Sequence, residues 1–223
     1  MNNDFLFFAI KQAHLKTAII EAHIFPSVQF FTKYFIYNQI YIESQARFQK
    51  QSYRNRYRVL GSNKVLHLIV PVNKGKTQLA YADVEIAHAD NWQREHLQTV
   101  KSCYGKAAFF EHYFHQYEAL LQSDEPKLFN WAVSTIKWIE AALQLPIKSQ
   151  IATDQSIIYH HDLRNAIHPK ERYNLPDSVF KPAPYFQCFE NGGFASNLSI
   201  LDLLFNEGPM SSQILQQSIN VNA

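Results

Sequence analysis

Residues 17–44 carry the pattern that most constrains the fold, because they predict a strand, a helix and a second strand in close succession. The stretch "TAIIEAHIF" is apolar and β-prone, and Pro26 follows it directly. The next residues, "SVQFFTKYFIYN", space their aromatic side chains as on a helix with a wide apolar face, and "QIYIES" returns to a strand pattern. Two strands joined through a helix favour an α/β or α+β fold with a twisted mixed sheet.

Alternating residues from Ser52 to Val59 predict the first strand of a β-hairpin within that sheet. The turn residues Gly61-Ser62-Asn63 separate this strand from the apolar return run "KVLHLIVPV". Successive side chains of a strand point to opposite faces, so aromatic and apolar side chains share one face. The other face then carries three arginines spaced about 6.6 Å apart, namely Arg54, Arg56 and Arg58.

The rest of the chain is predicted to be mainly helical. Residues 91–145 form a block of three helices, residues 82–87 and 149–158 are strand candidates, and residues 197–209 close the fold as a short helix. Ser199 is the expected N-cap of that last helix, with Asp202 as its capping-box partner. We expect one domain over residues 17–210, an N-terminal extension over 1–16 and a C-terminal tail over 211–223.

Positive charge is concentrated in one segment of a nearly neutral chain. Residues 44–82 hold eight of the 21 lysines and arginines and none of the 19 acids, although the net charge is only +2. Guanidinium groups match phosphate and carboxylate oxygens two at a time, so this segment suggests a site for an anion. A solvated strand face, or pairing with acids from the rest of the chain, is the simpler alternative.

The anion hypothesis assigns roles to particular side chains. Lys50, Arg54, Arg56 and Lys74 would bind the anion, while Gln51 and Asn55 would orient it. Under this hypothesis Arg54→Ala removes ligand binding and leaves the stability of the ligand-free protein nearly unchanged. Tyr53 offers a stacking surface, but nucleic acid is a less favoured partner because the other regions are acidic.

With these residues in view, the chain resembles the WbqC-like family of bacterial proteins. The similarity lies in "FPSVQFF", in "QKQSYRNR" followed by "PVNKG", in "NWQREHLQTVKSCYGKAAFFEHY" and in "NLSILDLLFNEGP". Matching positions include Gln29, Lys50, Gln51, Tyr53, Arg54, Asn55, Arg56, Lys74, His96 and Asp202. The family name comes from genes of surface polysaccharide synthesis, so the resemblance implies a role near sugar-nucleotide or amino-sugar metabolism.

Two classes of function remain open from the sequence. The first is a transferase-type enzyme acting on a phosphate-bearing or other anionic small molecule, with His96 or Asp202 handling the proton. The second is a non-catalytic binding or scaffold protein of an envelope-related pathway. A concave pocket lined by the cations, with a titratable group in reach, would favour the enzyme.

Cofactors and location follow from what the sequence lacks. It contains no glycine-rich phosphate loop, no serine elbow and no set of ligands with metal-binding spacing, so we expect neither a cofactor nor a metal. Its two cysteines cannot form a disulfide framework, and no apolar run is long enough to cross a membrane. The start of the chain is a poor secretory signal, which leads us to expect a cytoplasmic protein without a membrane partner.

Overall fold

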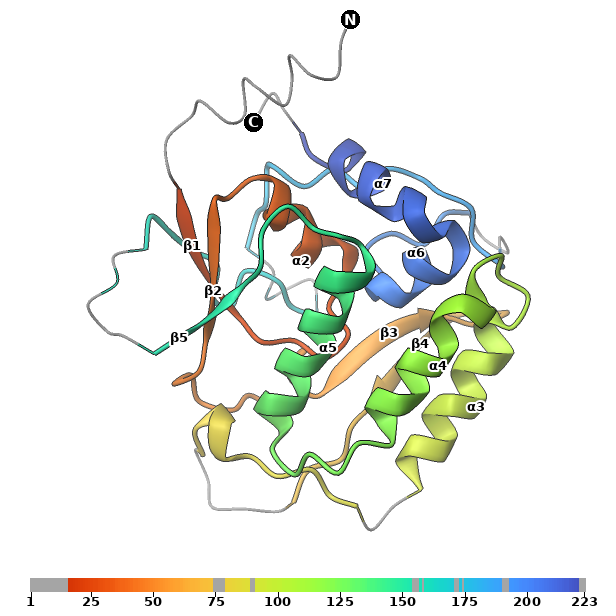
Figure 1. Ribbon diagram of the computed structural model, residues 1–223, viewed down its shortest axis with the longest axis horizontal. Helices are drawn as coiled ribbons and strands as arrows, with labels where there is room; N and C mark the ends of the chain where they lie inside the picture. Colours follow the sequence, from red (N-terminus) through yellow and green to blue (C-terminus); the bar gives the residue numbers. More distant parts are fainter. Residues whose placement is uncertain are drawn as a thin grey trace, which may run out of the picture.

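A parallel sheet of four strands forms one side of the protein, as the computed structural model shows (Figure 1). The structure describes residues 16–73, 79–88, 91–153, 157, 159–170, 173, 175–189 and 193–220. The strand order is β5-β2-β1-β6, from Gln150–Ala152, Gln39–Glu43, Thr17–Glu21 and His161–Asp162. All three pairings are parallel, so the carboxyl ends of the strands lie along one edge. The predicted α/β class is confirmed.

The predicted strand–helix–strand start is confirmed as β1, helix α2 (Val28–Thr32), the 3-10 turn η1 (Lys33–Phe35) and β2. Ile20 pairs with Ile42 in the register, and both side chains are buried. Phe25, in the loop after β1, has a left-handed backbone with φ of 38°. Its ring packs against those of Tyr57 and Trp131, which fixes the loop from both sides.

The predicted hairpin is present but does not join the larger sheet as expected, because β3 (Arg56–Leu60) and β4 (Val65–Ile69) form a separate two-stranded antiparallel sheet. The Gly61 amide donates to the Lys64 carbonyl at 3.0 Å, which closes the predicted turn. The strand begins only at Arg56, however, because the chain bends over residues 51–55. Arg54 therefore does not share a strand face with Arg56 and Arg58, and that part of the predicted alternation is wrong.

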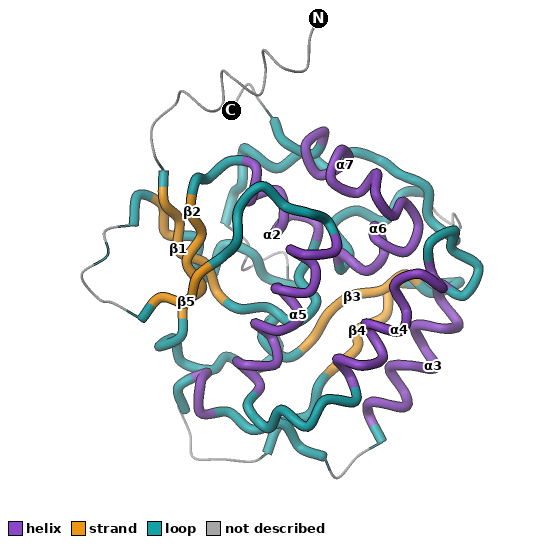
Figure 2. Tube along the Cα trace, viewed as in Figure 1, coloured by secondary structure: helices purple, strands orange, loops and turns teal. Residues whose placement is uncertain are grey.

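The predicted helical block consists of α3 (Trp92–Tyr104), α4 (Phe110–Leu121) and α5 (Leu128–Ala142). In the view of Figure 2, α5 lies between the parallel sheet and the hairpin, while α3 and α4 lie beside the hairpin. The predicted strand at 149–158 is present as β5, but the one at 82–87 is not. That segment holds the 3-10 turn η2 (Tyr81–Asp83) and isolated bridges at Glu85 and Ile86.

The chain closes with α6 (Ile200–Glu207), the 3-10 turn η4 (Gly208–Met210) and α7 (Ser211–Gln217). Ser199 caps α6 as predicted, since its Oγ accepts from the Leu201 amide at 3.3 Å. The residues expected to be a tail include helix α7, which buries Leu215 and packs on α2 and α6. The expected extension over residues 1–16 lies outside the described residues except for Lys16.

Candidate functional site

A polar pocket of about 510 Å³ lies at the carboxyl edge of the parallel sheet. Open α/β sheets commonly bind ligands at this edge. Glu21 and Asp162 end strands β1 and β6, and the segment after β2 supplies the opposite wall. The lining residues are Glu21, Ala46, Arg47, Phe48, Gln49, Arg54, Asp162, Arg164 and Asn165.

Glu21 and Arg54 form a buried ion pair at this pocket. Their exposed fractions are only 5% and 3%, and Arg54 Nη2 donates to Glu21 Oε1. A second donor, Arg54 Nη1, reaches the Arg47 carbonyl at 2.7 Å, which ties the loop to β1. Burial raises the pKa of Glu21, but the adjacent His23 and Arg54 outweigh it and hold the pKa below its ordinary value. Glu21 is therefore ionised at neutral pH.

Arg164 forms the second ion cluster of the pocket. Its Nε and Nη2 donate to the two carboxylate oxygens of Asp162 at 2.9 and 2.6 Å, and its Nη1 donates to Glu43 Oε2 at 2.9 Å. The hydrogen bond from Arg164 lowers the pKa of Asp162. The Arg164 side chain is 42% exposed, so its guanidinium stays accessible from the pocket mouth. Arginines and carboxylates thus nearly balance in charge around the pocket.

His23 lies behind Glu21 and is 1% exposed. Its Nε2 is 3.5 Å from Glu21 Oε2, which is beyond the length of a normal hydrogen bond. Its ring packs between Phe30 and Tyr53, with centroids 5.5 and 5.4 Å away. Neither ring nitrogen has a hydrogen-bond partner in the described part of the chain. A buried polar group without partners is costly, so this histidine is a candidate for a functional rather than a packing role.

His168 lies near Glu21 and His23, and both residues influence its pKa. Burial lowers its pKa, and Glu21 and His23 act on it in opposite directions. The amide of Lys170 donates to His168 Nδ1 at 3.1 Å, which orients the ring. The segment after β6 therefore covers the carboxyl end of β1.

The match to known proteins covers this pocket. The model of the WbqC-like protein family matches residues 22–174, more than half of the chain. The chain belongs to the WbqC-like protein family. Comparison with curated proteins and with solved structures found no match. The WbqC-like region includes every lining residue of the pocket except Glu21, which immediately precedes it.

The ligand residues predicted for this WbqC-like protein do not converge on one point. Arg54 lies at the pocket, whereas Arg56 lies on the hairpin. Lys50 and Gln51 are exposed in the bend before β3, where Gln51 Oε1 accepts from Lys170 Nζ. Lys74 lies outside the described residues.

The other three predicted ligand residues are buried and hold the fold together. Tyr53 packs on the ring of His23. Asn55 Nδ2 donates to the Val70 carbonyl at 3.1 Å and joins the two sides of the hairpin. Gln29 Nε2 donates to Asp177 Oδ2 at 2.8 Å, which links α2 to the long loop before α6.

The two predicted proton carriers of this WbqC-like protein lie away from the pocket lining. His96 is buried in α3, with Nδ1 3.0 Å from the Tyr57 hydroxyl, and burial lowers its pKa to about 4. Asp202 is buried in α6, where its Oδ2 accepts from the Tyr185 hydroxyl at 2.6 Å and from Gln187 Nε2 at 2.8 Å. Burial raises the pKa of Asp202. Its partners are Tyr185 and Gln187 rather than the cap of its own helix.

Glu21, Arg164, Asp162 and Glu43 are site residues that the sequence did not point to. Three of them, Glu21, Glu43 and Asp162, end parallel strands, and a carboxylate at the end of a predicted parallel strand is the signal that indicates this edge. A larger pocket of about 740 Å³ lies between α4, α5 and η4, but its lining has no carboxylate, lysine or arginine. Among the described residues, no group of His, Cys, Asp and Glu could hold a metal ion, and no helix is long and apolar enough to cross a membrane.

Proposed function

We propose that this WbqC-like protein is a transferase-type enzyme whose substrate is a sugar-type small molecule bearing a phosphate or another anionic group. The observation that carries the proposal is the buried Glu21–Arg54 pair, with His23 behind it, at the floor of the carboxyl-edge pocket. Burying an ion pair rarely stabilises a fold more than apolar residues of the same volume do. Its place at a ligand-binding edge therefore favours a role in binding or chemistry.

The mixed charges of the pocket support a ligand with more than one kind of polar group. Arg164 is accessible and can donate to a phosphate or carboxylate, while Asp162 can accept from hydroxyl or ammonium groups. Phe48 supplies an apolar surface for a sugar ring. A ligand with only anionic groups would gain less binding energy than one that also carries hydroxyl or ammonium groups, because each paired guanidinium already has a carboxylate partner.

In the proposed reaction, Glu21 and His23 handle the proton of the acceptor group. Glu21 lines the pocket and can accept a hydrogen bond from the hydroxyl or amine of the acceptor. Its lowered pKa makes it a weak base alone, so the proposed path of the proton continues to His23, whose Nε2 lies 3.5 Å from Glu21 Oε2. His23 replaces His96 and Asp202 in this role because its Nε2 lies 3.5 Å from the pocket residue Glu21, whereas His96 contacts Tyr57 and Asp202 contacts Tyr185.

The test is a thermal-shift screen of sugar phosphates, sugar nucleotides and acyl donors, followed by calorimetry on any hit. We expect Arg164→Gln to weaken binding at least tenfold and Glu21→Gln to abolish turnover. Arg94→Gln is the control, because it removes the same charge at an exposed position on α3. Equal binding by wild type and Arg164→Gln would overturn the proposal.

The alternative is a binding or scaffold protein, and the pairing of Arg54 and Arg164 with carboxylates favours it. Tight binding of a pocket ligand without turnover in any donor–acceptor pair would select it. For either function we propose a cytoplasmic location, since both cysteines are free thiols and suit a reducing compartment.

A further inference from the structure

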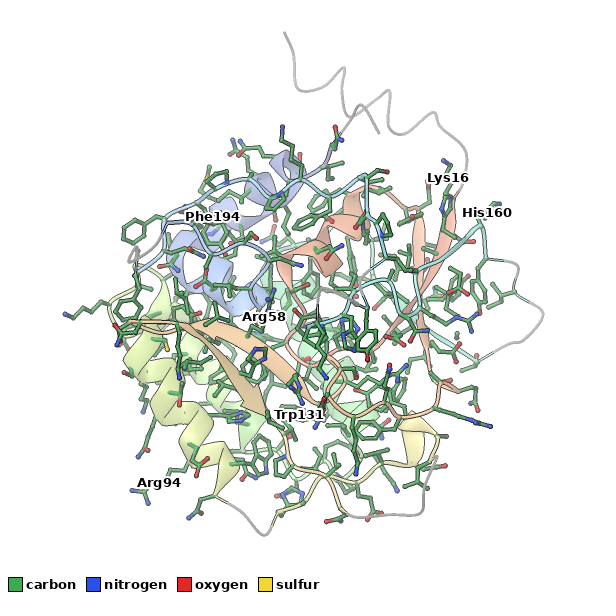
Figure 3. The ribbon with its side chains drawn as sticks, turned by 180° about the vertical axis from the view of Figure 1, so that it is seen from behind. Lys16, Arg58, Arg94, Trp131, His160 and Phe194 are labelled. Atoms are coloured by element: carbon green, nitrogen blue, oxygen red, sulfur yellow. The ribbon has the colours of Figure 1, made fainter. Side chains whose placement is uncertain are left out.

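The outer face of the hairpin carries a cluster of basic side chains separate from the pocket. Arg56 and Arg58 lie two residues apart on β3, so both side chains project to the same side. Arg58 pairs with His67 across the strands, and Arg56 pairs with Ile69. Figure 3 shows Arg58 near the middle of the face opposite to that in Figure 1. None of these four residues lines the carboxyl-edge pocket.

These two arginines differ from Arg54 and Arg164 in having no carboxylate partner within the described part of the chain. Arg58 Nη2 donates to the Asn197 carbonyl at 2.6 Å, and its guanidinium lies over the Tyr53 ring at 5.9 Å. The Arg56 side chain has no hydrogen bond or ion pair in the same described segments, although its backbone belongs to the β3–β4 pairing. The Nε atoms of both arginines are buried and unpartnered. Arg58 is thus held in place through Nη2, and the two Nη groups of Arg56 have no protein partner among the described residues.

The same face holds His67, which is subject to the field of both arginines. Partial desolvation lowers its pKa, and the positive charges of Arg56 and Arg58 lower it further. Arg56 and Arg58 lie two residues apart on one strand face, so their like charges repel each other, and an anion between them would relieve that repulsion. No acid lies between Glu43 and Asp83 in the sequence, so this segment itself cannot supply one.

We propose that Arg56, Arg58 and His67 form a second binding site, which takes the phosphate-type oxyanion of a small molecule. Arg58 presents a guanidinium fixed by Asn197 and Tyr53, and Arg56 contributes a fork without any competing partner. His67 adds one N–H donor when neutral. The oxyanion provides the counter-charge that the hairpin lacks. This inference does not depend on the carboxyl-edge pocket being catalytic.

The experiment measures binding of inorganic pyrophosphate by calorimetry and by thermal shift at constant ionic strength. We expect wild type to bind, Arg56→Gln to bind at least tenfold more weakly, and Arg58→Lys to lose affinity although it keeps the charge. Arg94→Gln is the matched control, and Figure 3 shows Arg94 well apart from Arg58. Arg56→Gln removes no described hydrogen bond or ion pair, so its folding should be little affected, which a thermal melt checks.

The other outcomes separate this site from the pocket. If Arg164→Gln abolishes pyrophosphate binding and Arg56→Gln does not, the anion binds in the pocket and the hairpin site is refuted. Absence of pyrophosphate binding by wild type, or equal losses in Arg56→Gln and Arg94→Gln, would also refute it. A nucleoside diphosphate and a single-stranded oligonucleotide form two further arms. Binding of the oligonucleotide alone, lost steeply with salt, would replace the small-molecule site with a nucleic-acid surface.

Discussion

Arg54 donates from Nη2 to Oε1 of Glu21, and this bond joins two residues that are 33 positions apart in the chain. Both side chains are almost fully buried at the carboxyl end of β1. The pair therefore fixes the loop before the hairpin onto the parallel sheet, and it also forms the floor of the pocket. One interaction thus links the two sheets of the fold to the candidate site.

Arg54→Ala is expected to destabilise the ligand-free protein by about 3–5 kcal/mol, because it leaves the Glu21 carboxylate buried without a counter-charge. The sequence-based expectation of an unchanged ligand-free stability is wrong if this loss is observed. Urea unfolding at pH 7.5 measures the free energy. The double variant Glu21→Leu/Arg54→Met should recover most of the loss, since no charge then remains buried. A loss below about 1 kcal/mol for Arg54→Ala would contradict the buried-pair argument.

His96→Gln is expected to flatten the pH dependence of stability between about pH 6.5 and 4. The unfolded state takes up a proton on His96 as the pH falls below about 6.5. The folded state takes up this proton only at lower pH, because burial lowers the pKa of His96 to about 4. The contribution of His96 to the free energy of unfolding is therefore fully present above about pH 6.5. It decreases by roughly 3 kcal/mol as the pH falls to about 4. Urea unfolding at four pH values measures the slope, and an unchanged slope in His96→Gln would count against it.

Local patterns predicted the secondary structure well, because each signal acts over a few residues. The turn at Gly61, the cap at Ser199 and the helical spacing from Trp92 onward all correspond to observed elements. The alternation before Arg56 did not, since Arg54 is turned inward by Glu21, a partner far away in sequence. A positive segment without local acids therefore predicts where cations lie but not what neutralises them.

The candidate site was harder to predict for the same reason. Glu21, Asp162 and Arg164 come from three separate parts of the chain, and only the parallel strand order places them at one edge. His96 and Asp202 looked reactive by residue type, but both are enclosed by core partners, Tyr57 and Tyr185 respectively. Residue type alone does not reveal burial, and burial decides whether such a group titrates in the useful range.

Asp202→Asn is expected to raise the melting temperature at pH 8, and to raise it less at low pH. Burial raises the pKa of Asp202, so the ionised form is disfavoured in the folded protein. Its contribution has the opposite sign to that of Glu21, because stability from this carboxyl increases as the pH falls and the group becomes protonated. The asparagine oxygen can still accept from Tyr185 and Gln187. A melting temperature lowered at pH 8 but not at low pH, where the carboxyl is protonated, would show that the charge itself is needed there.

His23→Phe is expected to stabilise the protein while abolishing the proposed turnover. The phenyl ring fits the same aromatic surroundings, between Phe30 and Tyr53, and removes two buried nitrogens that lack hydrogen-bond partners. A net gain of about 1 kcal/mol is expected in urea unfolding, because relief of the two unpartnered nitrogens outweighs the loss of the His23 contact that lowers the Glu21 pKa. Binding of a pocket ligand should persist, since Arg164 and Asp162 remain in place. A destabilised His23→Phe protein with normal turnover would instead assign His23 to the core and leave Glu21 without its proton partner.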